Sequence, residues 1–303
     1  MTTPAHTLQR RRRPGELVVI GLLAACAAVC VATTVGIVAT LATESVAFVQ
    51  RVPLREFLFG VEWSPTFADP AFGLVPLLAA TLLVTAIAMV VAIPVGVTTA
   101  IYLSEYARPG VRRVVKPALE VVAGIPTVVF GYFALTFLTP NLLQHVVPGM
   151  RVFNVLSAGL VIGIMVVPLV ASVAEDAMRA VPTSLREAGY GLGSTRRTVA
   201  TRVVLPAAFS GVAAGVLLAA SRAIGETMVV AIAAGQLAQL TLDPRDPAQT
   251  ITAYIVQVSL GDTPAGSTVY LTIFALGAVL FALTLILNVA AGVVVARLRE
   301  RCE

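Results

Sequence analysis

Apolar residues fall into six blocks along this chain of 303 residues. Each block is close to or above the roughly 20 apolar residues that a helix needs to cross a hydrocarbon core. The blocks cover residues 17–42, 74–103, 119–138, 155–173, 207–234 and 269–296. The pattern therefore predicts an all-α, polytopic membrane protein with six transmembrane helices.

Proline and glycine interrupt two of these blocks. Pro94 lies inside the second block, and Gly124 and Pro126 lie near the start of the third. Membrane helices tolerate such residues where neighbouring groups satisfy the freed backbone donors and acceptors. We therefore expect kinks and close helix packing at these positions.

The first block begins shortly after a run of four arginines, Arg10 to Arg13. A cleaved signal peptide is the alternative interpretation, but its apolar core is only about 7–15 residues long. This block is longer and lacks a convincing cleavage site, so we expect an uncleaved first helix. The arginine run then serves to fix topology, with binding to anionic lipid as the alternative.

Composition agrees with a membrane protein, because 58% of the residues are hydrophobic and only 12% are charged. Soluble domains average about 25% charged residues. The formal net charge is +5, but the basic residues lie between the apolar blocks and form no single patch, which disfavours nucleic-acid binding.

The basic residues are distributed unevenly between the two sides of the predicted helices. If the spans alternate from a cytoplasmic N-terminus, 16 of the 21 lysines and arginines are cytoplasmic, four are external, and Arg222 lies within a span. The external four are Arg51, Arg55, Arg151 and Arg245. Lysine and arginine are retained in cytoplasmic loops, so we expect both termini in the cytoplasm of a bacterium and the chain in its inner membrane.

These boundaries divide the chain into five segments. We expect a cytoplasmic tail (residues 1–16), a first transmembrane helix (17–42), an outer loop (43–73), a five-helix core (74–297) and a cytoplasmic tail (298–303). The core contains a long cytoplasmic loop, residues 177–206. On the outer side, the apolar run 251–260 is too short to span, and segments of this length are more often interfacial or re-entrant.

The cytoplasmic loop carries a spaced motif. Glu187-Ala188-Gly189 is followed by three residues, Gly193, nine residues, Val203, one residue and Leu205-Pro206. This resembles the EAA loop of type I ABC importer permeases, with Gly189 and Val203 as the departures. The residues alone predict a short protruding helix, a turn at Gly193 and a proline that starts the next span. An ordinary amphipathic interfacial helix is the alternative.

The resemblance implies a MetI-like permease architecture in which this loop docks on ATPase subunits and couples ATP-driven closure to the pore. The expected coupling residues are Glu187, Ala188, Gly189, Gly193, Leu205 and Pro206.

The fifth block contains the charged residues Arg222 and Glu226, four positions apart. On one helix they share a face and can pair. Ionisable residues inside a membrane are functional-site candidates, and a planar guanidinium binds two oxygens of an oxyanion at once. We expect Arg222, Glu226 and the hydroxyls of Ser221 and Thr227 to line a substrate pathway, with Glu226 neutralising Arg222 until an anion arrives. A structural salt bridge is the alternative.

The run Arg222 to Thr227 also resembles the phosphate-specific importer permeases. Three further runs resemble that family in the same order: Glu62-Trp63-Ser64-Pro65, residues 72–77 leading into Thr81-Leu82, and residues 123–131. Together they cover most of residues 54–300, and the tryptophan motif favours a PstC-type over a PstA-type subunit.

That resemblance implies a phosphate-importing complex of one PstC-type and one PstA-type permease, two ATPase subunits and an extracytoplasmic phosphate-binding protein. Residues 1–303 contain no GxxxxGK[ST] phosphate loop, so ATP and Mg would be used by partner subunits and no cofactor is expected on this chain.

Other functions remain open. A permease for sulfate or molybdate would share the EAA-like loop. A stand-alone secondary transporter would need a duplicated half that the sequence does not obviously show. An intramembrane enzyme would need paired catalytic acids or a nucleophile with its base. No metal site is expected either, because two histidines (His6, His145) and three cysteines (Cys26, Cys30, Cys302) have no metal-ligand spacing.

Overall fold

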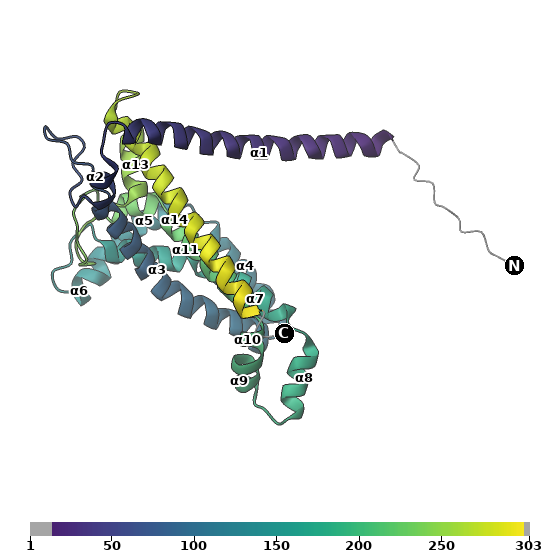
Figure 1. Cartoon of the computed structure of the whole chain (residues 1–303). Helices are drawn as coiled ribbons and strands as arrows, with labels where there is room; N and C mark the ends of the chain where they lie inside the picture. Colours follow the sequence, from purple (N-terminus) through teal and green to yellow (C-terminus); the bar gives the residue numbers. More distant parts are fainter. Residues whose placement is uncertain (1–13, 300–303) are drawn as a thin grey trace.

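The computed structural model describes residues 14–299, and this part of the chain is a bundle of helices (Figure 1). Its one β-type contact is an isolated antiparallel bridge between Trp63 and Phe72. Four helices are long and apolar enough to cross a membrane, and two bent helix pairs raise that number to as many as six. The predicted all-α fold is confirmed. The predictions for Arg10–Arg13 and for the tail residues 300–303, including Cys302, concern residues outside the described range.

The elements follow one another without a sheet in the described part of the chain. In chain order they are α1 (Pro14–Val49), α2 (Leu54–Phe59), α3 (Val75–Ile101), the π-helix η1 (Tyr102–Tyr106), α4 (Pro109–Ala123), α5 (Thr127–Phe133), the π-helix η2 (Ala134–Leu143), α6 (Gln144–Val146), α7 (Val155–Ala180), α8 (Thr183–Gly191), α9 (Arg196–Val199), the π-helix η3 (Ala200–Val204), α10 (Leu205–Ala207), α11 (Phe209–Ile224), α12 (Met228–Ala233), α13 (Ile251–Leu260) and α14 (Thr268–Arg299).

Helix α7 is the centre of the bundle and packs against both α3 and α11. Small residues allow α3 to approach it closely. A Cβ atom added at Gly163 would lie 2.8 Å from the carbonyl oxygen of Ala88, and one added at Gly159 would lie 2.7 Å from Ile87. Small residues at helix contacts are the usual means of tight packing in membranes, where no hydrophobic effect drives helices together. These close contacts fix the position of α7 relative to α3.

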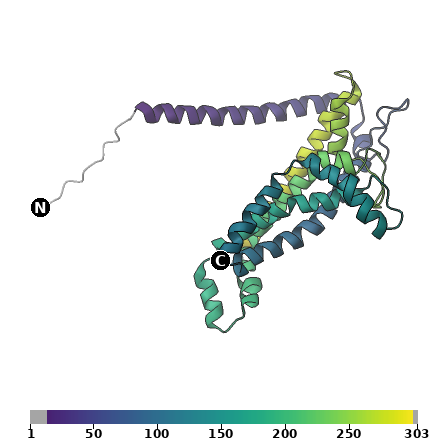
Figure 2. The same ribbon diagram turned by 180° about the vertical axis from the view of Figure 1, so that it is seen from behind.

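Helix α1 projects away from the bundle and contacts it only near its C-terminal end, beside α14 (Figures 1 and 2). Its apolar side chains from Val18 onward are mostly exposed, whereas Phe48 is buried against Phe57 and Phe72. A helix that is apolar all round is covered by lipid or by other protein. The first helix is longer than the predicted 17–42, because α1 runs from Pro14 to Val49.

Two of the predicted spans are bent rather than continuous. Helices α4 and α5 meet at 85° across residues 124–126, because the residue before Pro126 is disfavoured in the helical conformation. The kink predicted at Gly124 and Pro126 is thus confirmed, and the helix that precedes it, α4, is amphipathic and begins at Pro109. The fifth span, predicted as residues 207–234, bends by 73° at Ala208 and ends at Ile224, with α12 beginning only at Met228.

At the end of the bundle where α1 meets α14, α13 packs against the loop that carries Trp63. Helix α13 covers Ile251–Leu260, the short apolar run that the sequence singled out. The Trp63 ring contacts Tyr254 of α13 edge to face, with 4.9 Å between ring centroids. The predicted short helix is confirmed, and half of its residues are buried against the bundle.

Candidate functional site: a charged pocket and a protruding helix

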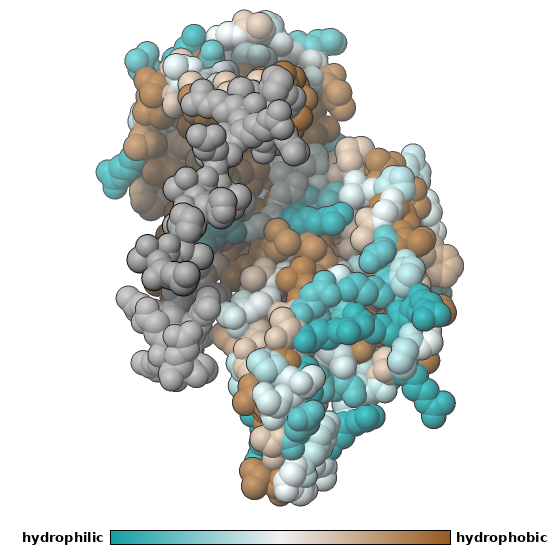
Figure 3. Space-filling model, turned by 90° about the vertical axis from the view of Figure 1, so that its right-hand side faces the viewer, coloured by the Kyte–Doolittle hydropathy of each residue, from teal (hydrophilic) through white to brown (hydrophobic). Residues whose placement is uncertain are grey.

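Helices α8 and α9 protrude from one end of the bundle (Figures 1 and 2). Figure 3 shows hydrophilic residues gathered over this half of the visible face. Glu187 and Ala188 are exposed on α8, whereas Gly189 is buried against Val199. Gly193 has a φ of +76°, a left-handed conformation that favours glycine. The predicted protruding helix and turn are thus present, and Leu205 and Pro206 lie in α10 just before α11.

A basic residue of α8 anchors this protrusion to the bundle. Arg186 donates hydrogen bonds to the carbonyl oxygens of Val181 (2.6 Å) and Met178 (2.8 Å), which lie at the end of α7. It also forms an ion pair with Glu105 of η1, at 3.0 Å. Arg186 and Glu105 are 81 residues apart, which gives no sequence signal, so their pairing was not predicted and Arg186 counted only toward topology.

Arg222 and Glu226 do not form the predicted ion pair. Helix α11 ends at Ile224, so the two side chains no longer share a helix face. The Glu226 carboxylate instead accepts hydrogen bonds from the backbone N–H groups of Met228 (3.2 Å) and Val229 (3.4 Å). Glu226 is buried and caps α12, and the prediction that it neutralises Arg222 is wrong in this conformation.

The two hydroxyls expected beside these charges also have local partners. Ser221 donates to the Asn288 side chain of α14 at 3.2 Å, and Thr227 donates to the carbonyl oxygen of Gly225. Of the four predicted pathway residues, only Arg222 lines the pocket described next.

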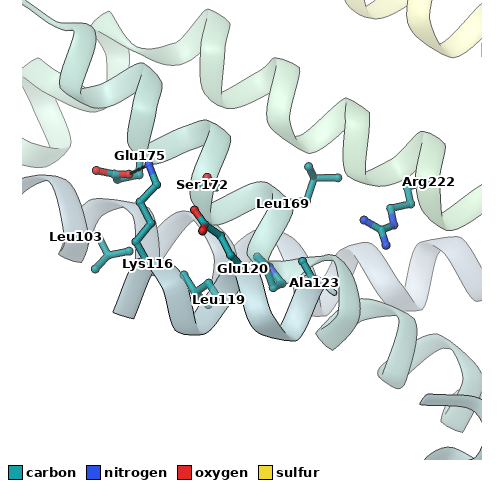
Figure 4. A pocket seen from close by; sticks show the side chains of 10 residues that line it. Leu103, Lys116, Leu119, Glu120, Ala123, Leu169, Ser172, Glu175 and Arg222 are labelled. Carbon is teal, nitrogen blue, oxygen red and sulfur yellow. Dashed lines mark hydrogen bonds and ion pairs between the residues drawn. The ribbon is translucent and has the colours of Figure 1, made fainter. Parts of the chain in front are cut away.

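A pocket of about 150 Å³ lies between α4, α7 and α11 (Figure 4). It combines apolar walls with side chains of both charges. Its lining residues are Leu103, Lys116, Leu119, Glu120, Ala123, Pro168, Leu169, Ser172, Glu175 and Arg222. Figure 4 shows Arg222 at the Leu169 end with its guanidinium directed toward the pocket, Lys116 at the Glu175 end, and Glu120 between them. Charged groups from three helices therefore face one space.

Glu175 is the most enclosed charge of the pocket, with its side chain 0% exposed. Arg112 of α4 contacts it at 2.6 Å, Lys116 of α4 at 2.9 Å and Arg179 of α7 at 3.9 Å. Lys116 also contacts Asp176 at 2.7 Å. A buried charge persists only when it is paired, so α4 supplies the cations that allow Glu175 to be buried.

This cluster was not predicted from the sequence, although the α7 segment carries a signal for it. Glu175 lies four residues after Ala171 and three before Met178, on the same buried face of α7. An acidic residue at a core position indicates a buried partner. The partners themselves lie about 60 residues earlier in the chain, and sequence spacing alone does not identify them.

A larger pocket of about 570 Å³ lies between the Trp63 loop and α13. Its walls are mainly aromatic, amide and hydroxyl side chains, including Trp63, Tyr254, Gln249 and Gln257, and Glu62 is its one charged lining residue. This pocket therefore offers no cation to an anion, in contrast to the pocket at Arg222.

Comparison with known proteins agrees with this arrangement. Residues 92–300 match the family described as "Binding-protein-dependent transport system inner membrane component". The chain is 34% identical to the "Probable ABC transporter permease protein YqgH" of Bacillus subtilis, over 87% of this chain and 85% of that protein. It is 32% identical to the "Phosphate transport system permease protein PstC" of Mesorhizobium japonicum, over 81% and 79%.

The fold is also found in a solved transporter. A chain of a bacterial alginate ABC transporter, crystallised with its pentasaccharide-bound periplasmic protein, superimposes with a TM-score of 0.61 over 92% of this chain and 96% of that one, at 17% identity. That identity supports the fold alone. Together with the sequence matches it shows that this chain, built around a central α7 and a protruding α8, belongs to the binding-protein-dependent transport system inner membrane components, as a permease of the PstC type.

Proposed function

We propose that this chain is the PstC-type permease subunit of an ATP-driven phosphate importer. The observation that carries the proposal is Arg222, an exposed cation on an otherwise apolar helix that faces a charged pocket. The name of the relative from Mesorhizobium japonicum supports phosphate as the substrate.

Arg222 is suited to bind an anion that passes through the protein. A charged side chain facing lipid at the centre of a membrane costs about 2.5–3.5 kcal/mol on insertion scales, so Arg222 faces an aqueous pathway or a second subunit. Within residues 14–299 no carboxylate forms an ion pair with it. Its planar donors therefore remain available for a bidentate oxyanion contact.

Glu120 favours phosphate over the sulfate and molybdate alternatives. This exposed carboxylate lines the same pocket as Arg222, and an ionised carboxylate can only accept hydrogen bonds. Phosphate carries a proton at neutral pH and can donate it to Glu120, whereas sulfate and molybdate carry none and would meet an uncompensated like charge.

The importer requires partners, and the exposed surfaces support each of them. The exposed apolar surface of α1 supports a PstA-type permease as the second half of the pathway. Exposed Glu187 and Ala188 on α8 support docking of ATPase subunits, which would bind and hydrolyse ATP with Mg while this chain stays non-catalytic. The outer pocket at Trp63 supports contact with an extracytoplasmic phosphate-binding protein.

The distribution of basic residues between the two ends of the bundle supports the proposed orientation. Arg186, Arg196 and Arg197 lie on the protruding α8–α9 end. Arg151 and Arg245 lie in the loops that meet beside the N-terminal end of α7. Arg108, Arg179 and Arg202 add to the first end, and Arg51 and Arg55 add to the second. The first end therefore carries more basic residues, which supports a cytoplasmic location for it and for both termini.

Uptake by the reconstituted complex tests the proposal. We expect phosphate uptake and phosphate-dependent ATP hydrolysis with all subunits present, and neither when this chain is omitted. Uptake of sulfate or molybdate in place of phosphate would replace the substrate assignment. Uptake by this chain alone, driven by an ion gradient, would favour a secondary transporter.

A further inference from the structure

Lys116 is the single lysine of a chain in which the other 20 of 21 basic residues are arginine. It occurs on α4, at the end of the Arg222 pocket that lies nearer the C-terminus of α7. Lysine differs from arginine in carrying a compact, mobile charge on a flexible stem rather than a rigid planar fork. The one position with this chemistry therefore lies in the proposed pathway.

We propose that Lys116 is a second oxyanion-binding residue, which receives phosphate from Arg222 on its way to the cytoplasm and holds Glu175 and Asp176 when phosphate is absent. The inference rests on the proposed function and adds a residue and a step to it.

One pocket extends from Arg222 to Lys116. Along α7 its wall extends from Pro168 to Glu175, a length of about 10 Å at 1.5 Å per residue. Arg222 lies at the Leu169 end and Lys116 at the Glu175 end, and the side chains of Leu119, Glu120 and Ala123 form the wall between them (Figure 4). Helix α7 continues past Glu175 to α8, so Lys116 lies on the side of Arg222 that faces the protruding end.

The ion pairs around Lys116 allow it to change partners. If Lys116 turned toward an anion, Glu175 would still be paired with Arg112 at 2.6 Å. Removing the only partner of a buried charge is strongly destabilising, and the second cation avoids this outcome. Glu175 therefore does not depend on Lys116 alone.

The other partner of Lys116 is easily displaced. The Asp176 side chain is 62% exposed and that of Lys116 is 26% exposed, and ion pairs open to solvent contribute little. An oxyanion entering the pocket would take the place of the Asp176 carboxylate at the ammonium group. Because a competing carboxylate stays nearby, the anion would also leave again.

Labelling the wild-type importer tests this directly, because an amine-reactive reagent has one lysine to modify on this chain. We expect phosphate to protect Lys116. At a concentration ten times that needed for half protection, labelling at this residue should slow about tenfold, as one-site occupancy requires. Mass spectrometry of the tryptic or chymotryptic peptides would measure the rate. Unchanged labelling across the phosphate concentrations that saturate uptake would overturn the inference.

Three substitutions separate anion binding from a purely structural tie between α4 and α7. Lys116→Gln should lower the maximal uptake rate at least about tenfold, the scale of losing one charge-assisted contact, with ATPase subunits still bound. Asp176→Asn should strengthen phosphate binding, so that a lower phosphate concentration protects Lys116 from labelling. Arg113→Gln, on the same helix but outside the pocket, is the matched control with wild-type uptake.

These measurements distinguish a wrong role for Lys116 from a wrong proposed function. If Asp176→Asn lowers uptake as Lys116→Gln does, the pair is a structural tie and the inference about Lys116 is wrong. If the wild-type complex imports phosphate but Lys116→Gln imports it at the wild-type rate, the inference also fails while the proposed function stands. If the wild-type complex imports no phosphate, the proposed function itself fails.

Discussion

Arg186 of the protruding helix α8 and Glu105 of η1 form an ion pair of 3.0 Å in which the Glu105 side chain is only 5% exposed. The same guanidinium binds two carbonyl oxygens at the end of α7. One side chain thus joins the proposed ATPase-docking helix to both α3, which continues into η1, and α7, which lines the charged pocket.

The first prediction concerns that connection. Arg186→Gln leaves a nearly buried carboxylate without its partner, a loss of about 3–5 kcal/mol where the charge stays buried. We expect ATP hydrolysis to continue while phosphate uptake per ATP falls. The ratio of uptake to hydrolysis in proteoliposomes measures this.

The double variant Arg186→Gln with Glu105→Gln is the control for stability. It removes both charges, so the complex should regain its thermal stability while uptake per ATP stays low. Recovery of the full uptake ratio would show that the pair only stabilises the fold.

The second prediction concerns the turn after α8. Gly193 has a positive φ, and no atom lies within 4 Å of the position that a Cβ atom would take. The free-energy cost of a valine there is therefore the left-handed backbone strain, about 1–2 kcal/mol. Gly193→Val should shift α8 and weaken retention of the ATPase subunits during purification, and Glu187→Lys should do the same through charge reversal.

Gly191→Ala is the matched control for this turn. Gly191 is exposed, lies on α8 and has open space at its Cβ position, so the complex should assemble normally. Intact assembly and normal transport in both Gly193→Val and Glu187→Lys would contradict a coupling role for α8.

The third prediction separates Arg222 from Glu226. Because they are not paired, Arg222→Gln should abolish phosphate uptake with little change in stability, within about 0.5 kcal/mol as for other exposed substitutions. Glu226→Gln should instead weaken the start of α12 by about 0.3–1 kcal/mol, because the amide oxygen can still accept the backbone hydrogen bonds but the negative charge that favours the helix N-terminus is lost.

Thermal unfolding of each purified variant, together with its uptake rate, tests the separation. A marked loss of stability in Arg222→Gln that Glu226→Gln reverses would show that the two residues pair in another state of the transporter.

The fourth prediction concerns selectivity. If Glu120 accepts the proton of phosphate, Glu120→Gln supplies an amide that can also donate to a fully deprotonated oxyanion. Sulfate should then compete with phosphate uptake in the variant but not in the wild type. An unchanged preference for phosphate would place selectivity elsewhere in the importer.

The fifth prediction concerns topology. A cysteine in place of exposed Arg196 should react with a membrane-impermeant reagent only in inside-out vesicles, and one in place of Asp246 only in intact cells. Cys26, Cys30 and Cys302 would be replaced by alanine first. Reaction from the opposite side at both positions would reverse the orientation.

The sequence predicted those elements that depend on local composition. The lengths of the apolar blocks gave the possible spans, the ten-residue run 251–260 gave α13, and Gly193 gave the turn after α8. Each of these is decided by residues close together in the chain.

Features that depend on distant residues could not be predicted in the same way. Pairing of Arg222 with Glu226 assumed a continuous helix, but Gly225 and the Glu226 cap end α11 there. The ion pairs of Glu175 connect α7 to a helix that begins more than 60 residues earlier, and an apolar pattern does not specify which helix of a bundle supplies a cation.

Helix α1 has a consequence for how the subunit is made. The helix stands free of the rest of the chain over most of its length (Figure 1), and its apolar side chains are exposed there. In a bilayer, lipid or a neighbouring membrane protein covers such a surface, so a subunit made in excess of its partners would offer it to other unassembled membrane chains. If the PstA-type permease proposed above covers α1, the abundance of this protein should fall when that partner's gene is deleted, without any change in its own transcription.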